Sequence, residues 1–200
     1  MRKFISGMIL GAGASQRFGE PKQLLPYAGA TLLGWVVSQA QQAIALDEVV
    51  VVLGRSAEEI RERVDFGEAK VVENPVFTEG CASSYRAGIS AIDARAEAIM
   101  IILGDQPGIT PEIINTLAGE WRNTDAPISL CSYEGRKGHP MIFARSLFDR
   151  LEVLHGDKAA WKLVDAHEAL VHPVHLALPF PEDINTREDF ERIASAKAVN

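Results

Sequence analysis

Leu10-Gly-Ala-Gly-Ala-Ser-Gln-Arg-Phe-Gly-Glu-Pro-Lys22 continues an apolar run that begins at residue 4. The run is typical of a strand that is buried on both faces. The three glycines of the stretch and their small neighbours leave backbone N–H groups uncovered, and such amides form a concave site for an anion. Arg17 and Lys22 add positive charge at the same place. A loop of this kind after a first strand predicts a nucleotide phosphate site.

The loop differs from the two commonest phosphate-binding motifs. A dinucleotide fingerprint needs a third glycine three residues after the second, but here no glycine follows Gly13 until Gly19. A P-loop needs a lysine directly after its last glycine, but two residues separate Gly19 from Lys22. One of them, Pro21, disfavours a helical Glu20, so we expect an extended segment up to the lysine. The alternative that local composition leaves open is a glycine-rich turn with basic residues on its surface.

The bulk composition narrows the class of protein. The chain has 200 residues, 47% of them hydrophobic, which suffices for the core of one domain spanning residues 1–200. Its net charge of −7 and its lack of a Lys/Arg cluster argue against a nucleic-acid partner. Its apolar runs are too short to span a membrane, and its N-terminus lacks the features of a signal peptide. Cys81 and Cys131 lie far apart, which favours a reduced, cytoplasmic protein without disulfides, and no zinc-type cluster is present.

The order of predicted elements indicates an α/β fold. Strand and helix patterns alternate through residue 122, which is typical of a mostly parallel sheet with helices on both faces. Thr31 and Thr110 are predicted N-caps, and Ser56 is predicted to begin a capping box. The predicted strands cover residues 4–10, 48–54, 69–73, 98–103, 127–133, 140–143 and 170–176, with a polar turn at 134–138. The predicted helices cover residues 32–45, 57–65, 81–94, 111–122, 145–154, 158–167 and 186–196.

Asp105 is the candidate metal ligand that the local sequence singles out. It follows the predicted strand at 98–103, in Leu103-Gly-Asp-Gln-Pro107. Ligands of open parallel sheets bind beyond the carboxyl ends of the strands, and a buried carboxylate there is costly unless it is paired. Mg²⁺ prefers one or two carboxylates together with phosphate oxygens and waters. The alternative is an aspartate that caps the turn before Pro107.

A second stretch at a strand end, residues 74–84, leads into a predicted helix. Gly80, Ser83 and Ser84 offer bare amides and short hydroxyls that could read the edge of a nucleotide base. An ordinary loop with serine caps is an equally good interpretation of this stretch alone.

Residues 10–26, LGAGASQRFGEPKQLLP, resemble the signature of small nucleotidyltransferases. The match is best to the branch of MobA-like NTP transferases that contains the molybdenum cofactor cytidylyltransferases and their guanylyltransferase relatives. Further matches follow in the family's order: the Asn74-Pro stretch, Gly-Asp-Gln-Pro, Gly138-His-Pro140 and Asp183-Ile-Asn-Thr186. The resemblance implies a Rossmann-like fold of the nucleotide-diphospho-sugar transferase type. It also implies transfer of an NMP unit from an NTP to a phosphorylated acceptor, with release of pyrophosphate.

The resemblance assigns roles to particular residues. It implies that Asp105 and Asp183 bind Mg²⁺, that Arg17, Lys22 and Asp105 are catalytic, and that Gly11 lies near the base. His139 is a candidate contact of the acceptor, although a lone histidine is more often structural. The residues expected to bind the nucleotide are Leu10, Gly11, Ala12, Gly13, Ser15, Arg17, Lys22, Gly80, Ser83 and Ser84.

The substrates follow from the same resemblance. Residues 21–26 look more like the cytidylyl branch, so CTP and molybdopterin are the favoured substrates, with GTP or another phosphorylated acceptor as alternatives. The family's Gly-Asp-x-Gly-Ala-Arg is replaced here by Gly156-Asp-Lys-Ala-Ala-Trp161, so the acceptor could differ. A molybdoenzyme or its chaperone is a further partner that the resemblance allows. The rival hypothesis from another class is a non-catalytic nucleotide-binding chaperone of a molybdoenzyme.

Overall fold

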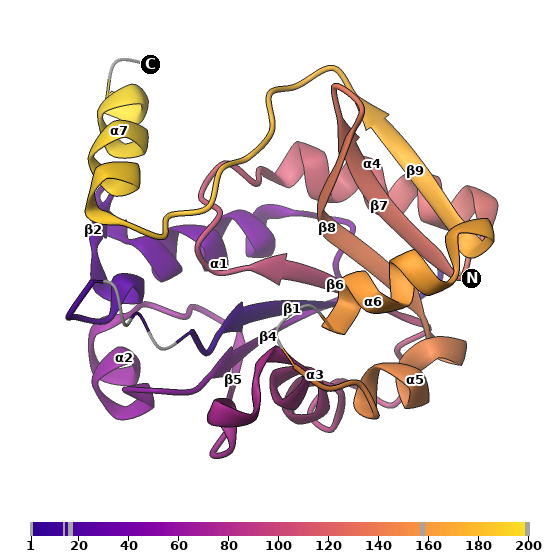
Figure 1. The fold of residues 1–200 in the computed structure, drawn as a ribbon, viewed down its shortest axis with the longest axis horizontal. Coiled ribbons are helices and arrows are strands. Elements are labelled where there is room, and N and C mark those ends of the chain that lie inside the picture. The colour runs from indigo at the N-terminus through magenta and orange to yellow at the C-terminus, as the bar shows by residue number, and fades with distance from the viewer. Residues whose placement is uncertain (1, 14, 16–17, 157–158, 199–200) are drawn as a thin grey trace.

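A seven-stranded sheet forms the centre of the protein (Figure 1). The structure is a computed structural model that describes residues 2–13, 15, 18–156 and 159–198. The strands are β1 (Ile5–Gly11), β4 (Glu48–Leu53), β5 (Lys70–Glu73), β6 (Ala98–Leu103), β7 (Ile128–Tyr133), β8 (Arg136–Ala144) and β9 (Val171–Leu176). Their order is β5-β4-β1-β6-β8-β7-β9, and β8 runs antiparallel to both of its neighbours while the other pairs are parallel. The predicted mostly parallel α/β sheet is confirmed.

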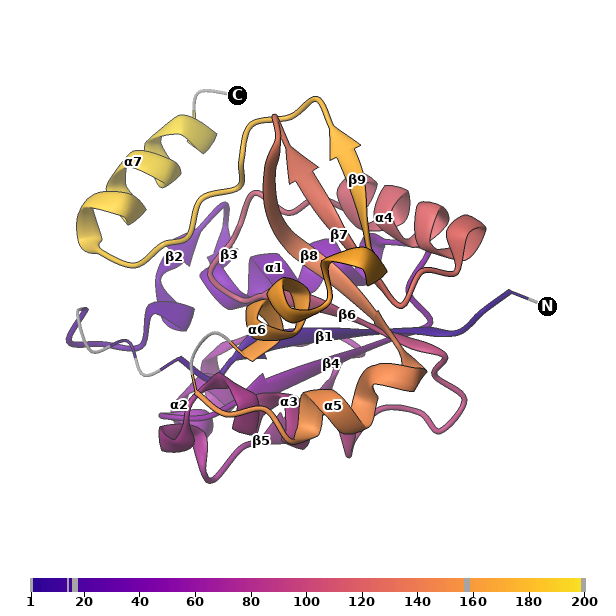
Figure 2. The same ribbon diagram turned by 45° about the vertical axis from the view of Figure 1, so that its right-hand side comes forward.

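Helices cover both faces of this sheet (Figure 2). Side chains of β1 and β4 alternate between the faces: Ile9 and Val51 join a core cluster with α1 (Leu32–Gln42) and α4 (Pro111–Thr124). Met8 and Val52 join a second cluster with α3 (Cys81–Ile89), α5 (Phe148–Glu152) and α6 (Ala159–Ala166). Because both faces are covered, these strands are apolar almost throughout.

The remaining elements are short or peripheral. They are α2 (Ala57–Arg63), α7 (Arg187–Ala198), a small hairpin of β2 (Pro26–Tyr27) with β3 (Ala30–Thr31), and the 3₁₀ turns η1 (Lys22–Leu24), η2 (Phe77–Glu79), η3 (Arg145–Leu147) and η4 (Glu168–Leu170). Among the described residues, no helix is both long and apolar enough to cross a membrane.

The C-terminal segment returns to the part of the chain that follows β1 (Figure 1). After β9 it runs toward α1 and the β2–β3 hairpin, where Ile184 is fully buried with Leu25, Tyr27 and Leu32. Phe190 of α7 packs on the same small cluster. This return brings residues 183–186 next to the loop that follows β1.

Most predicted elements are present, but two local predictions are wrong. Thr31 and Thr110 cap α1 and α4 as predicted, with each hydroxyl oxygen accepting a backbone N–H three residues on. Ser56 makes no capping hydrogen bond, because its backbone is left-handed with φ of 60° and carries the hydroxyl away from the helix amides. The turn after β7 is also shorter than predicted: Glu134 and Gly135 both have positive φ, the geometry of a two-residue hairpin turn, so β8 already begins at Arg136.

Gly104 provides a stability test of the packing between β1 and β6. Its N–H donates to the carbonyl of Leu10 at 3.0 Å, and a Cβ on Gly104 would lie 2.9 Å from that oxygen and 3.0 Å from Cδ1 of Leu33. We therefore expect Gly104→Ala to lower the free energy of unfolding by about 1–3 kcal/mol, as overpacking does. Gly119→Ala is the control, since its Cβ meets nothing within 4 Å in α4 and alanine favours a helix. Urea unfolding measures the free energy of unfolding of both variants, and equal values for the two would contradict this account.

Candidate active site

A cleft of about 590 Å³ opens at the carboxyl ends of β1, β4 and β6. It lies where ligands bind in open parallel sheets. Predicted site residues that line it are Leu10, Gly11, Ala12, Gly13, Lys22, Gly80, Ser84 and Asp105. Residues that line it without having been predicted are Gln23, Arg55, Phe77, Thr78, Cys81, Leu103 and Gly104. Ser15 lines an adjoining recess of about 170 Å³, and Arg17 lies outside the described residues.

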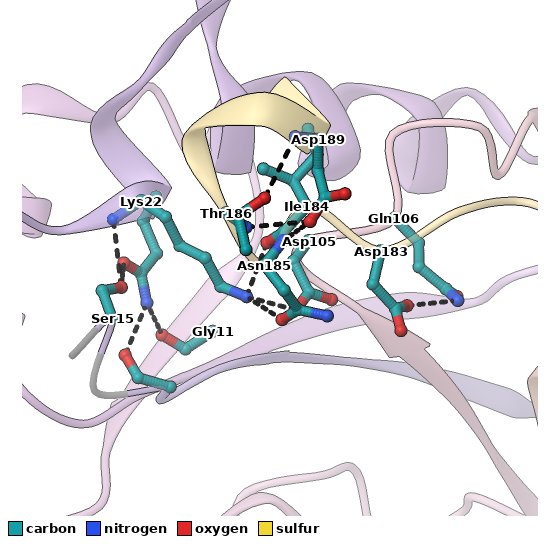
Figure 3. A network of polar contacts seen from close by, with 12 residues as sticks. Gly11, Ser15, Lys22, Asp105, Gln106, Asp183, Ile184, Asn185, Thr186 and Asp189 are labelled. Carbon is teal, nitrogen blue, oxygen red and sulfur yellow. Dashed lines mark hydrogen bonds and ion pairs between the residues drawn. The ribbon is translucent and has the colours of Figure 1, made fainter. Parts of the chain in front are cut away.

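Gln23 holds the glycine-rich loop in shape. Its side chain is almost fully buried, and Nε2 donates to the carbonyls of Gly11 at 2.8 Å and Gly13 at 3.0 Å. Oε1 accepts from the hydroxyl of Ser15 at 3.2 Å, and that hydroxyl oxygen accepts the backbone N–H of Lys22 at 3.0 Å (Figure 3). The loop is thus tied to the 3₁₀ turn behind it, and the two carbonyls are satisfied within the protein.

Gly11 reaches the cleft through its backbone. A Cβ on Gly11 would lie 3.3 Å from Leu33, Leu53 and the carbonyl of Val52, in the core under the cleft. An alanine at this position would therefore point into the packing of β1 against β4 and α1. The backbone of Gly11 lines the cleft, but a side chain at this position would not face it.

Lys22 joins three parts of the chain at the cleft. Its ammonium group donates to Asp105 Oδ2 at 2.5 Å, to the carbonyl of Ile184 at 2.9 Å and to Asn185 Oδ1 at 3.2 Å (Figure 3). The side chain of Lys22 is only 12% exposed. An ammonium group has three donors, so all three are occupied here. Lys22 therefore holds Asp105 and the C-terminal segment together, and contact with a phosphate requires one of these partners to be exchanged.

Asp183 lies beside Asp105 and is held by Gln106. Gln106 Nε2 donates to Asp183 Oδ1 at 2.7 Å, and the backbone N–H of Ile184 donates to the carbonyl of Asp105 at 2.9 Å. Burial raises the pKa of Asp183, and the negative charge of Asp105 raises it further. The structure thus brings together the two carboxylates that the sequence had placed far apart in the chain.

This pair of carboxylates fits a hard divalent cation. A cation between two neighbouring carboxylates would remove the repulsion that now raises the pKa of Asp183. Among the described residues no group of three or more His, Cys, Asp or Glu side chains could hold a metal by itself. The chain therefore offers two oxygen ligands and leaves the others to water and phosphate, which is the pattern typical of Mg²⁺.

The two serines of the predicted base site differ in their surroundings. Asn74 Nδ2 donates to Ser83 Oγ at 2.7 Å and to Ser84 Oγ at 3.1 Å. Ser83 in turn donates to the carbonyl of Gly80 at 2.7 Å and is not part of the cleft lining, whereas Ser84 and Gly80 are. Ser83 therefore shapes the start of α3 from behind, and Ser84 is the hydroxyl that faces the cleft.

His139 is buried outside the cleft lining. It lies in β8, and its ring packs edge-on against Trp161 with 5.9 Å between the ring centroids. Burial lowers its pKa to about 4, and the negative charge of Asp105 opposes this shift. The imidazole is therefore neutral at neutral pH and close enough to Asp105 to sense its charge.

This lowered pKa predicts a pH-dependent stability. As the pH falls from 6.5 to about 4, the unfolded chain binds a proton at His139 while the native protein does not. We expect this histidine to remove about 3 kcal/mol of stability across that interval. Urea unfolding at several pH values should show a smaller acid loss in His139→Asn, with the exposed His175→Asn as control. An NMR titration of His139 with a midpoint near 6.5 would contradict the prediction.

Gln23, Arg55 and Thr78 are polar cleft residues that the sequence interpretation missed. Arg55 follows β4 by two residues, so the strand-end rule that identified Asp105 could have found it. Gln23 directly follows Lys22, but nothing local indicates that it turns back to the carbonyls of Gly11 and Gly13.

A solved nucleotidyl transferase from Methanothermobacter, 24% identical, shares this fold with a TM-score of 0.83 and covers 98% of this chain and 99% of its own. The chain belongs to the family of the MobA-like NTP transferase domain, whose model matches residues 7–171.

Named relatives include molybdenum cofactor enzymes of both kinds. A probable molybdenum cofactor guanylyltransferase of Bacillus cytotoxicus is 34% identical over 98% of each chain. The molybdenum cofactor cytidylyltransferase of Escherichia coli is 28% identical over 70% of each chain. The nicotine blue oxidoreductase of Paenarthrobacter nicotinovorans is 34% identical over 72% of each chain.

Two solved mycobacterial structures are similar throughout. A protein from Mycobacterium sp. strain JC1 has a TM-score of 0.90 at 35% identity and covers 100% of this chain and 99% of its own. A Mycobacterium tuberculosis protein in complex with manganese has a TM-score of 0.84 at 33% identity and covers 98% of this chain and 100% of its own.

Proposed function

We propose that the chain, as one domain over residues 1–200, transfers CMP from CTP to the phosphate of a molybdopterin-type acceptor and releases pyrophosphate. The observation that carries this proposal is the pairing of Lys22 with Asp105 in the lining of the cleft beside the glycine-rich loop, with Asp183 near Asp105. Cationic and metal-binding groups beside bare backbone amides are what nucleotidyl transfer requires.

The chemistry needs no nucleophile from the protein. An oxygen of the acceptor phosphate attacks the α-phosphorus of the NTP, and the bond from that phosphorus to the bridging oxygen breaks. The electron pair goes to the oxygen of the leaving pyrophosphate. The backbone amides of the loop at residues 12–19 would hold the phosphates in line, with Arg17 and Lys22 supplying positive charge. The protein's contribution is thus positioning and charge stabilisation.

Asp105 and Asp183 are the residues that would hold Mg²⁺. The bound ion supplies neutralisation of the charge on the phosphate oxygens. The manganese complex of the mycobacterial relative supports a divalent ion of this kind. Lys22 keeps Asp105 in place, and Gln106 does the same for Asp183.

CTP is the nucleotide we favour, and GTP is the second candidate. Residues 21–26 resemble the cytidylyl branch, and the Escherichia coli relative is a cytidylyltransferase. GTP is favoured instead by the names of the relatives that match almost the whole chain. We also propose a cytoplasmic location, since the wide separation of Cys81 and Cys131 in the sequence favours a reduced protein.

Pyrophosphate release tests the proposal directly. Purified protein is assayed with Mg²⁺, molybdopterin and each of CTP, GTP, ATP and UTP. Release with CTP alone is the expected result, and release with GTP alone would place the chain with the guanylyltransferases. Nucleotide binding without release would favour the non-catalytic chaperone of a molybdoenzyme. Release with an alternative phosphorylated acceptor but not with molybdopterin would contradict molybdopterin as the acceptor. The departure of residues 156–161 from the family pattern would then account for the different acceptor.

A further inference from the structure

Arg55 lies at the edge of the cleft and has no partner among the residues that the structure describes. Among the described residues, each of the other arginines contacts an acid, a carbonyl, a histidine or an aromatic ring. Arg55 makes no such contact with any residue that the structure describes, and its side chain is exposed. A guanidinium group with five free donors beside a nucleotide cleft is available to a ligand.

The position of Arg55 is shared by two adjoining cavities. It lines both the 590 Å³ cleft and the 170 Å³ recess, and the only other described residues that do so are Gly13 and Gln23. The recess is smaller than the roughly 300 Å³ at which small-molecule pockets begin, so it suits a small group at the end of a larger ligand. Arg55 therefore stands where a ligand in the cleft would extend its tail into the recess.

The recess has the chemistry of an anion site. Gly13 and Gly19 contribute backbone without side chains, while the hydroxyl of Ser15 is engaged by Gln23 and by the backbone of Lys22. Its acidic residue, Glu20, is paired with Arg187 of α7 at 2.7 Å, so Glu20 leaves the guanidinium of Arg55 uncommitted. An arginine fork binds two oxygens of a phosphate at once, which a lysine cannot do.

We infer that Arg55 binds the terminal two phosphates of the nucleotide in this recess and carries the charge of the departing pyrophosphate. The inference rests on the proposed nucleotidyl transfer. As the bond between the α-phosphorus and the bridging oxygen breaks, negative charge grows on the pyrophosphate. A guanidinium there stabilises that charge more in the transition state than in the bound substrate.

Binding measurements separate this role from catalysis. Isothermal titration calorimetry in the presence of Mg²⁺ measures the affinity of each protein for inorganic pyrophosphate, CTP, GTP and CMP. The proteins compared are wild type, Arg55→Ala and Arg55→Lys. Arg63→Ala is the matched control, because Arg63 lies on neighbouring α2, pairs with Glu59 and lines neither cavity. We expect Arg55→Ala to bind pyrophosphate and the triphosphate about 10- to 100-fold more weakly, with unchanged affinity for CMP. Arg55→Lys should be intermediate, and Arg63→Ala should match wild type.

The other outcomes would contradict the role of Arg55, the proposed nucleotidyl transfer, or both. Equal pyrophosphate affinity of Arg55→Ala and wild type would remove Arg55 from the site while leaving the proposed function intact. An equal loss of affinity for CMP and CTP would place Arg55 at the nucleoside end and also overturn the inference. If the wild-type protein binds neither pyrophosphate nor any of the nucleotides, both the inference and the proposed function fail.

Discussion

Asp105→Ala should abolish nucleotidyl transfer and leave the protein folded. Asp105 is the carboxylate that Lys22 holds at the end of β6, and it is one of the two oxygen ligands proposed for the divalent metal. Loss of metal-assisted charge neutralisation costs several kcal/mol in the transition state, so turnover should fall by at least about 1,000-fold. The backbone carbonyl of Asp105 still accepts from Ile184, so the C-terminal segment keeps that anchor.

Two measurements check this result. Pyrophosphate release reports turnover, and Mn²⁺ titration followed by electron paramagnetic resonance reports metal affinity. Asp105→Asn keeps the shape of the side chain and should fail in both assays, whereas Asp149→Ala, an exposed aspartate on α5, should behave as wild type. Wild-type turnover by a folded Asp105→Ala protein would remove Asp105 from the metal site.

Lys22→Met should have the second-largest effect, because it removes one group that serves two purposes. The ammonium pairs with Asp105 and also holds the carbonyl of Ile184 and the amide of Asn185. Without it, Asp105 loses its cation and residues 184–185 lose their tie to the first loop. We expect turnover to fall about 100- to 1,000-fold and the segment after β9 to become more sensitive to limited proteolysis.

The proteolysis readout distinguishes this account from a purely catalytic role. Lys22→Arg keeps the charge and should restore the resistance of the C-terminal segment, while its different donor geometry leaves turnover below wild type. Lys70→Met is a control far from the cleft, since Lys70 contacts the carbonyl of Ala91. Unchanged proteolysis in Lys22→Met would show that the C-terminal segment is held by its apolar contacts alone.

Much of the fold followed from the order of local patterns. Continuous apolar runs predicted β1, β4 and β6, and Thr31 and Thr110 predicted the starts of α1 and α4. The patterns failed where backbone conformation and not residue type decides, as at Ser56 with its positive φ and at the tight turn after β7. Local sequence carries too little information about such angles, because several residues adopt them only under tertiary constraint.

The lining of the cleft was predictable in part. Asp105 and the glycine-rich loop, which line it, could be singled out because both stand at strand ends in local contexts that limit their roles. Gln23 and Arg55 were missed. The contacts of Gln23 depend on how the chain turns after Lys22, and the importance of Arg55 depends on which loops surround it.

By itself, the sequence determined the α/β class, the strand that carries the glycine-rich loop, and the chemical types of the candidate ligands. These follow from hydrophobic periodicity and from bare backbone amides, which are local properties. Only the tertiary structure decided that Lys22 pairs with Asp105, that Asp183 lies beside it, and that Arg55 borders the recess. The physical reason is that strand order in the sheet and the return of the C-terminal segment bring distant residues together. Contacts over such separations depend on the packing of the whole chain and leave no periodic trace in its sequence.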